Sequence, residues 1–242
     1  VRVLCAGLDY YCYQSVRELP PFFDHKYRIC YSKIELANQI NNIIHPSARE
    51  VIRKYGENKS LEVNYIGDLP ARSGIGSSSS FTVGLITSLS ALNGKFMGRS
   101  LLANSAIDLE QGPMNEKVGF QDQCASAFGG IVLIEAQGSM IAPRRFITTK
   151  RYQEYISSAL LMGFDGQQRN SQVCSSRISK SVISKSYAEI MSNLNEFSNE
   201  GIKAFADEAD IYKHSIITKK CRDLKLKLNG EEDNIRQNEI IY

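Results

Sequence analysis

The chain of 242 residues is long enough for one large domain or two modest ones. Its 43% hydrophobic and 23% charged residues exclude intrinsic disorder, collagen-like repeats and coiled-coil rods. The net charge of +3 gives no indication of nucleic-acid binding, and no apolar run approaches the roughly 20 residues of a membrane span. We therefore expect a cytoplasmic globular protein with neither nucleic-acid nor membrane partners.

The first part of the chain is predicted to combine short strands with a helical layer. Aromatic and β-branched runs predict strands at residues 1–6, 10–16 and 27–32. Residues 34–55 carry apolar side chains close to helical spacing, and Pro46 is placed to begin a second helix within that segment.

The middle of the chain is predicted to be a strand, a loop and three helices that lead to another strand. Apolar and polar residues alternate over 61–66, as in a strand with one buried face. A loop rich in Gly and Ser follows at 69–80, and apolar side chains nearly surround the helix predicted for 81–93. The later predicted elements are helices at 100–111 and 119–128 and a strand at 130–135.

The composition changes after about residue 150, which indicates a second domain. Residues 160–164 favour one more strand, whereas residues 171–228 are polar, rich in Lys and Ser, and mostly helical in pattern. We therefore divide the chain into an N-terminal domain of residues 1–145 and a C-terminal domain of residues 146–242.

The loop rich in Gly and Ser is the first candidate functional feature. Gly74 and Gly76 permit a left-handed backbone, and the helix that follows points free N–H groups and its positive dipole end at the loop. Such a loop favours an anion. It is not a Walker A loop, and Ser79 stands where a Rossmann fingerprint needs its last glycine. From the loop alone, a turn that caps a core helix remains the alternative.

The segment Pro-Ala-Arg-Ser-Gly-Ile-Gly-Ser-Ser-Ser at residues 70–79 resembles the phosphate-binding loop of the GHMP kinases. Residues 17–23, 31–36, 67–74 and 118–123 together resemble the D-glycero-D-manno-heptose 7-phosphate kinase branch of that superfamily. The resemblance covers residues 8–175. It implies an α+β GHMP kinase fold, with an N-terminal domain of the ribosomal protein S5 domain 2-like class and an incomplete α+β C-terminal domain.

The resemblance also implies transfer of a phosphoryl group from Mg-ATP to the anomeric hydroxyl of a sugar phosphate, here D-glycero-D-manno-heptose 7-phosphate. Asp122 matches the family's catalytic aspartate, although a helix-capping role is the alternative. Glu110 and Ser78 match the residues that contact Mg²⁺, with a solvated surface acid as the alternative for Glu110. Arg169 is a candidate contact to the substrate's phosphate. The expected ATP-binding residues are Pro70, Arg72, Ser73, Gly74, Ile75, Gly76, Ser77, Ser78 and Ser79.

Differences from the family predict a chain that is truncated at both ends. It lacks the family's N-terminal strand with a Gly-Gly-Thr-Asp segment, and also a C-terminal Gly-rich loop. Two alternatives therefore stay open: another sugar-1-kinase of the superfamily, similar to fucokinase, and a truncated pseudokinase that binds nucleotide without catalysis. A homodimer is left open as an assembly.

Overall fold

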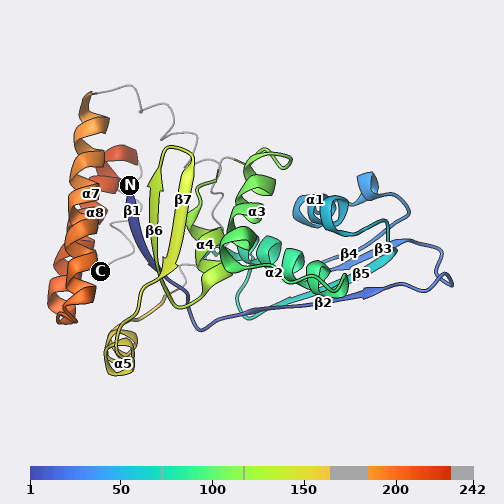
Figure 1. Cartoon of the computed structure of the whole chain (residues 1–242), viewed down its shortest axis with the longest axis horizontal. Coiled ribbons are helices and arrows are strands. Elements are labelled where there is room, and N and C mark those ends of the chain that lie inside the picture. The colour runs from blue at the N-terminus through green and yellow to red at the C-terminus, as the bar shows by residue number, and fades with distance from the viewer. Residues whose placement is uncertain (72, 117, 164–184, 230–242) are drawn as a thin grey trace. The chain divides into compact units, whose positions relative to one another are not determined.

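The computed structural model describes residues 1–71, 73–116, 118–163 and 185–229. The chain forms two compact units, whose elements are labelled in Figure 1. One is the 6–130 unit; the other, here called the split unit, consists of residues 1–5 together with the chain from residue 131 onward. These units are defined by contacts within the chain, whereas the boundary that we predicted at residue 145 divides the N-terminal and C-terminal domains of the family. That boundary stays a prediction.

The 6–130 unit contains a mixed four-stranded sheet in the order β2-β5-β3-β4. Strand β5 runs antiparallel to β2 and parallel to β3, while β3 and β4 are antiparallel. The strands predicted at 10–16, 27–32 and 61–66 are confirmed with small shifts of their ends. The four strands are β2 (Cys12–Glu18), β3 (Tyr27–Cys30), β4 (Ile34–Ala37) and β5 (Leu61–Gly67).

Strand β4 corrects the helix predicted to begin at residue 34. The burial of side chains alternates along it, so that Glu35 and Ala37 are buried whereas Ile34 and Leu36 are 64% and 60% exposed. The predicted helix assumed that the side chains of Ile34 and Leu36 face the core. In the structure they face outward, and the period of two is that of a strand.

Four α-helices complete the 6–130 unit, and Figure 1 shows α1 and α2 along one face of the sheet. Helix α2 packs on α1, α3, α4 and strand β2, and it is buried along most of its length, as predicted. Pro46 is the first residue of α1, also as predicted. The helices are α1 (Pro46–Tyr55), α2 (Ser77–Leu92), α3 (Arg99–Gln111) and α4 (Gln121–Phe128), and a short 3₁₀ helix, η1, covers Ile40–Asn42.

The split unit contains a three-stranded sheet in the order β1-β6-β7. Strands β1 and β6 correspond to predicted strands, whereas β7, which pairs with β6 across a turn at Gly138, and helix α5 were not predicted. Residues 160–163 do not form the expected strand, and Phe164 lies outside the described residues. The elements are β1 (Arg2–Ala6), β6 (Ile131–Gln137), β7 (Met140–Arg145), α5 (Lys150–Ser158), α7 (Lys185–Ala206) and α8 (Ile211–Asn229).

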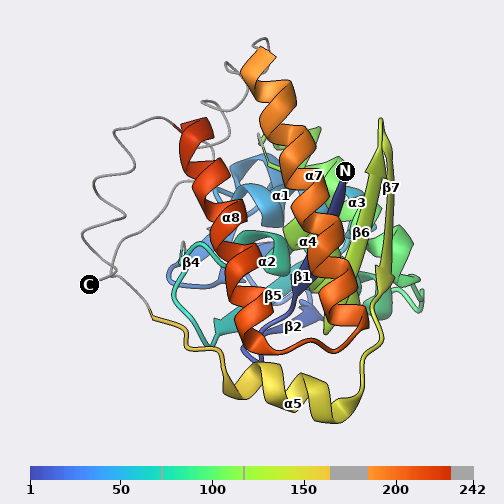
Figure 2. The same cartoon turned by 90° about the vertical axis from the view of Figure 1, so that its left-hand side faces the viewer.

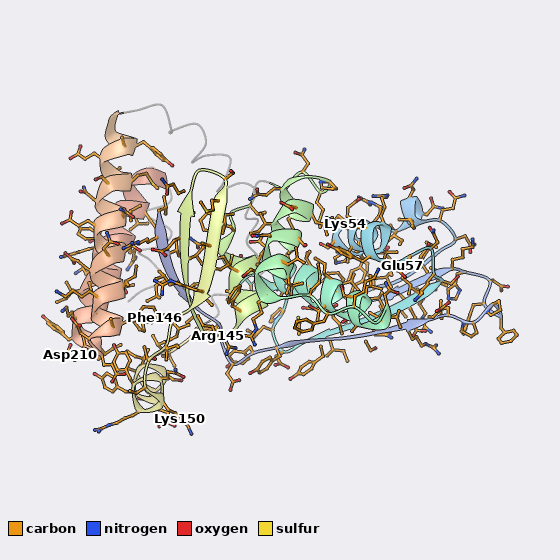
Figure 3. All side chains as sticks on the ribbon, in the orientation of Figure 1. Lys54, Glu57, Arg145, Phe146, Lys150 and Asp210 are labelled. Carbon is orange, nitrogen blue, oxygen red and sulfur yellow. The ribbon has the colours of Figure 1, made fainter. Side chains whose placement is uncertain are left out.

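Helices α7 and α8 lie side by side in Figures 1 and 2, which confirms the helical prediction for the described part of this region. Hydrogen bonds from Tyr152 of α5 reach both α8 and the turn between α7 and α8. The Tyr152 hydroxyl donates to the carbonyl of Ala209 at 2.8 Å and also meets Nε2 of His214. Lys150 and Asp210, labelled in Figure 3, mark the start of α5 and this turn. Among the described helices, none is both long and apolar enough to cross a membrane.

Candidate functional site

The loop before α2 has the backbone conformation for which glycine is needed. Gly74 and Gly76 have φ angles of 81° and 78°, which are in the left-handed region. Gly76 is the N-cap of α2 and offers no side chain to the first N–H groups of the helix. These donors and the helix dipole are therefore directed at the loop, as an anion site requires.

Asp122 lies directly against this loop. A Cβ atom added to Gly76 would lie 3.0 Å from both Cβ and Cγ of Asp122, so a larger residue at position 76 would displace the aspartate. Phe120 occupies the N-cap position of α4 and Asp122 is the second residue of the helix. The helix-cap alternative for Asp122 is therefore not what the structure shows, although an acidic residue in the first turn also suits the helix dipole.

The environment of Asp122 favours the protonated carboxyl. Although much of the residue's surface is exposed, desolvation by the surrounding atoms raises the pKa of its carboxyl above the ordinary value of 3.8. The direction of this shift makes the carboxylate a stronger base than a fully solvated aspartate.

Glu110 is buried in the last turn of α3, with 1% of its surface exposed. The surface-acid alternative is therefore wrong. Its Oε2 atom accepts hydrogen bonds from Oγ of Ser79 at 3.0 Å and from Nε2 of Gln123. Its Oε1 atom is buried and has no hydrogen-bond partner in the described structure. Burial raises the pKa of Glu110, the nearby Thr82 hydroxyl and the hydrogen bonds from Gln123 and Ser79 act in the opposite direction, and the charge of Asp122 adds to the rise.

The serines at the start of α2 face different surroundings. Ser79 is 5% exposed and contacts Glu110, whereas Ser78 is exposed at the second position of the helix. Ser80 shares a hydrogen bond of 2.9 Å with Ser126 of α4. The structure thus brings Ser79, rather than Ser78, to Glu110, and the proposed contact between Ser78 and a metal ion stays a prediction.

The oxygen atoms at this site suit Mg²⁺. The partnerless Oε1 atom of Glu110 and the nearby serine hydroxyls are hard oxygen donors. Among the described residues, no group of three or more His, Cys, Asp and Glu side chains gathers as a metal site. Mg²⁺ typically takes only one or two carboxylates and completes its shell with water and substrate phosphates, so this arrangement is compatible with it.

The remaining predicted site residues divide into two groups. Arg72 and Arg169 lie outside the described residues. Pro70, Ile75 and Ser77 lie within the 70–79 segment, and Oγ of Ser73 is buried there without a hydrogen-bond partner among the described residues. Gln123 and Thr82 were missed by the sequence analysis. The only signal for Gln123 was its position directly after Asp122.

The fold is similar to that of known proteins. Residues 41–130 match the family model described as GHMP kinases N terminal domain. A D-glycero-D-manno-heptose 1-phosphate kinase from Bacteriodes thetaiotaomicron superposes with a TM-score of 0.69 at 17% identity, over 93% of this chain and 70% of that one. The Methanococcus jannaschii mevalonate kinase superposes with a TM-score of 0.65 at 15% identity, over 94% of this chain and 73% of that one. Lactococcus lactis galactokinase complexed with galactose superposes with a TM-score of 0.56 at 14% identity, over 86% of this chain and 65% of that one.

The chain therefore has the GHMP kinase fold, as the sequence predicted, and the family model covers the segment that contains the loop, Glu110 and Asp122. A comparison with curated protein sequences finds no match. At these identities the solved structures establish the fold alone.

Proposed function

We propose that this chain is an ATP-dependent kinase of the GHMP type, which transfers the γ-phosphoryl group of ATP to a hydroxyl of a small molecule. The observation that carries the proposal is the arrangement of two carboxylates around a glycine loop at a helix N-terminus. Asp122 lies against Gly76 in the loop. Glu110 of α3 accepts a hydrogen bond from Ser79, which is in the first turn of α2 directly after the loop. Phosphoryl transfer needs a phosphate cradle, oxygen ligands for a divalent cation and a group that orients the acceptor.

Each part of the site has a proposed role. The residues of the 70–79 loop hold the ATP phosphates through backbone N–H groups and serine hydroxyls. Glu110, with Ser78, holds Mg²⁺, which when bound neutralises charge on the phosphate oxygens. Asp122 orients the acceptor hydroxyl and accepts its proton, a role that its raised pKa favours.

We further propose that the acceptor is D-glycero-D-manno-heptose 7-phosphate and the product the 1,7-bisphosphate. The four sequence segments that resemble the heptose kinase branch support this choice, and the structural similarity to a heptose 1-phosphate kinase is compatible with it. An anomeric hydroxyl is more acidic than an ordinary alcohol, so a carboxylate is an adequate base. Mevalonate and galactose, the substrates named by other similar structures, are the alternatives to be tested.

The acceptor is tested by incubating the chain with Mg-ATP and each of these three compounds. ADP formation reports turnover, and phosphorus NMR distinguishes an anomeric phosphate from other esters. We expect ADP and an anomeric phosphate with the heptose phosphate. Turnover with mevalonate or galactose instead would retain the kinase and replace the substrate. Binding of Mg-ATP without turnover on any acceptor would favour the pseudokinase alternative.

The role of Asp122 is tested by Asp122→Asn, which keeps the shape of the side chain and removes its charge. General-base contributions are on the order of 10²–10⁴-fold, so kcat should fall by about that factor while ATP affinity changes little. Asp108→Asn, at an exposed position of α3, is the matched control and should leave kcat unchanged. Near wild-type turnover in Asp122→Asn would remove the aspartate from the mechanism.

A further inference from the structure

Gln123 is an unusually buried polar side chain next to the proposed catalytic aspartate. Only 1% of its surface is exposed, and it belongs to α4, one residue after Asp122. A buried amide is costly unless its polar atoms find partners. Its Nε2 donates to Oε2 of Glu110, whereas its own Oε1 has no partner among the described residues. The side chain is therefore committed to a single polar contact, the one to Glu110.

That contact is one of two on the same carboxylate oxygen. Ser79 from α2 and Gln123 from α4 both donate to Oε2 of Glu110, which belongs to α3. Hydrogen bonds to a carboxylate are shorter and roughly twice as strong as those between neutral groups. Two of them on one oxygen fix the rotation of the carboxylate, and Oε1 has no donor among the described residues, since the Thr82 hydroxyl donates to the carbonyl of Ser78.

We propose that Gln123 is a positioning residue, which holds the Glu110 carboxylate so that Oε1 is presented to the divalent cation of a bound nucleotide. The proposal rests on the proposed function. It extends that function by making the metal ligand depend on the helix that carries Asp122. Partners of this kind that orient a metal ligand are typically worth 10–100-fold in metal affinity.

The test is the variant Gln123→Met, which has a similar length and no donor. The matched control is Gln121→Met, because Gln121 is exposed on the other side of Asp122 in the same helix turn. Calorimetry of the full chain measures the affinity for the ATP analogue AMP-PNP with Mg²⁺ and again with EDTA. The ratio of the two affinities reports the contribution of the metal without any turnover. We expect Gln123→Met to lower this ratio about 10–100-fold and to leave the affinity in EDTA unchanged, while Gln121→Met changes neither.

Ser79→Ala removes the second donor and should lower the same ratio. If Gln123→Met does not melt cooperatively, Gln123→Asn replaces it, because its amide is too short to reach Glu110 yet remains polar. A wild-type ratio above one that persists in these Gln123 variants overturns the positioning role and leaves the proposed function intact. An equal loss of affinity with Mg²⁺ and with EDTA also overturns it, because the role is then structural. Absence of any nucleotide binding by the wild type removes the proposed function and this inference with it.

Discussion

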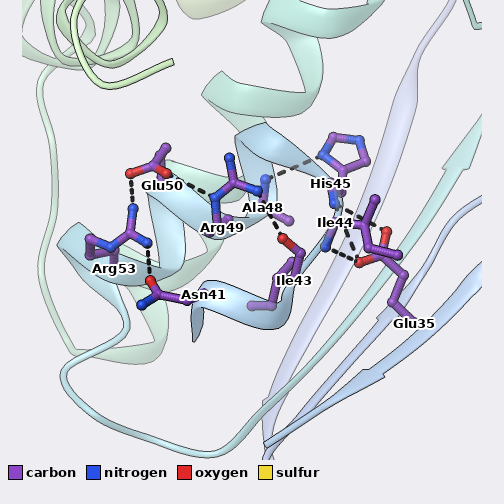
Figure 4. A network of polar contacts seen from close by, with 9 residues as sticks. All are labelled: Glu35, Asn41, Ile43, Ile44, His45, Ala48, Arg49, Glu50 and Arg53. Carbon is purple, nitrogen blue, oxygen red and sulfur yellow. Dashed lines mark hydrogen bonds and ion pairs between the residues drawn. The ribbon is translucent and has the colours of Figure 1, made fainter. Parts of the chain in front are cut away.

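His45 caps helix α1 through its ring rather than through a hydroxyl or carboxylate. Its Nδ1 accepts the backbone N–H of Ala48 at 3.3 Å, as Figure 4 shows, and its ring stacks on Phe81 with centroids 4.4 Å apart. The acceptor role requires Nδ1 to be unprotonated. Burial lowers the pKa of His45, and the facing carboxylate of Glu35 acts in the opposite direction.

This cap should make stability depend on pH. Because the pKa of His45 is lower in the folded chain than its ordinary value of 6.5, the stabilisation is fully present above pH 6.5 and is lost as pH falls below it. The loss should approach about 1 kcal/mol, the usual value of an N-cap. His45→Asn keeps a capping acceptor without titrating, so urea unfolding between pH 5 and 8 should show a smaller slope with pH. An unchanged slope in His45→Asn would contradict the assignment.

At the same scale, the sequence identified the main candidates of the site but not their contacts. Glu110 and Asp122 stand in segments that resemble a known pattern, so they could be predicted. Four serines in succession, residues 77–80, gave no means of choosing the partner of Glu110. The helical periodicity of α2 selects Ser79, because Ser79 lies on the same buried face of the helix as Val83 and Ile86. Gln123 is polar and would ordinarily be expected at the surface.

At the scale of elements, Glu35 connects strand β4 to the start of α1. Its carboxylate accepts the hydroxyl of Tyr31 at 2.5 Å. It also accepts the backbone N–H of Ile44 at 2.7 Å and that of His45, as Figure 4 shows. Burial and this carboxylate together raise the pKa of Tyr31 to about 12. A second polar cluster, on α1, surrounds Glu50. Burial raises the pKa of Glu50, but the hydrogen bonds and charges of Arg53 and Arg49 lower it by more, so the net pKa is lowered.

Glu35→Gln should therefore destabilise the 6–130 unit. The amide retains only one acceptor oxygen, so its N–H₂ group meets backbone donors, and buried donors without partners cost about 1–3 kcal/mol. Glu18→Gln, at an exposed position of β2 in the same sheet, is the control and should stay within about 0.5 kcal/mol of the wild type. Urea denaturation measures both free energies of unfolding. Equal stability of the two variants would show that the carboxylate does not join β4 to α1.

The same network explains why strand β4 could not be predicted. The sequence pattern assigns apolar residues to the core, but here Glu35 occupies the buried face because Tyr31 and two backbone N–H groups satisfy it. Long-range partners of this kind are invisible in a local pattern. Strand β7 was missed for a different reason, since Pro143 lowers its strand signal and is tolerated at a sheet edge. Helix α1 was predictable, because Pro46 marks its start locally.

At the scale of the whole molecule, one compact unit is inserted into the other along the chain. Residues 1–5 and the chain from residue 131 onward form the split unit, and the 6–130 unit lies between them in sequence. The hydrophobic core cluster that contains Ile29, Leu61 and Leu85 extends only from Tyr27 to Leu109, so it lies wholly within the 6–130 unit. Glu110, Gln123, Asp122 and the loop belong to that unit as well.

We therefore expect a fragment of residues 6–130 to fold without the rest of the chain. Its sheet keeps all four strands and its core cluster is complete, so it should melt in one cooperative transition. The complementary fragment of residues 131–242 lacks β1, and its sheet is reduced to the β6–β7 hairpin, which is marginal by itself. Far-UV circular dichroism during heating, with amide dispersion in NMR spectra, measures both. A 6–130 fragment that melts without cooperativity, while the 131–242 fragment melts sharply, would show that the stability of the chain resides in the split unit instead.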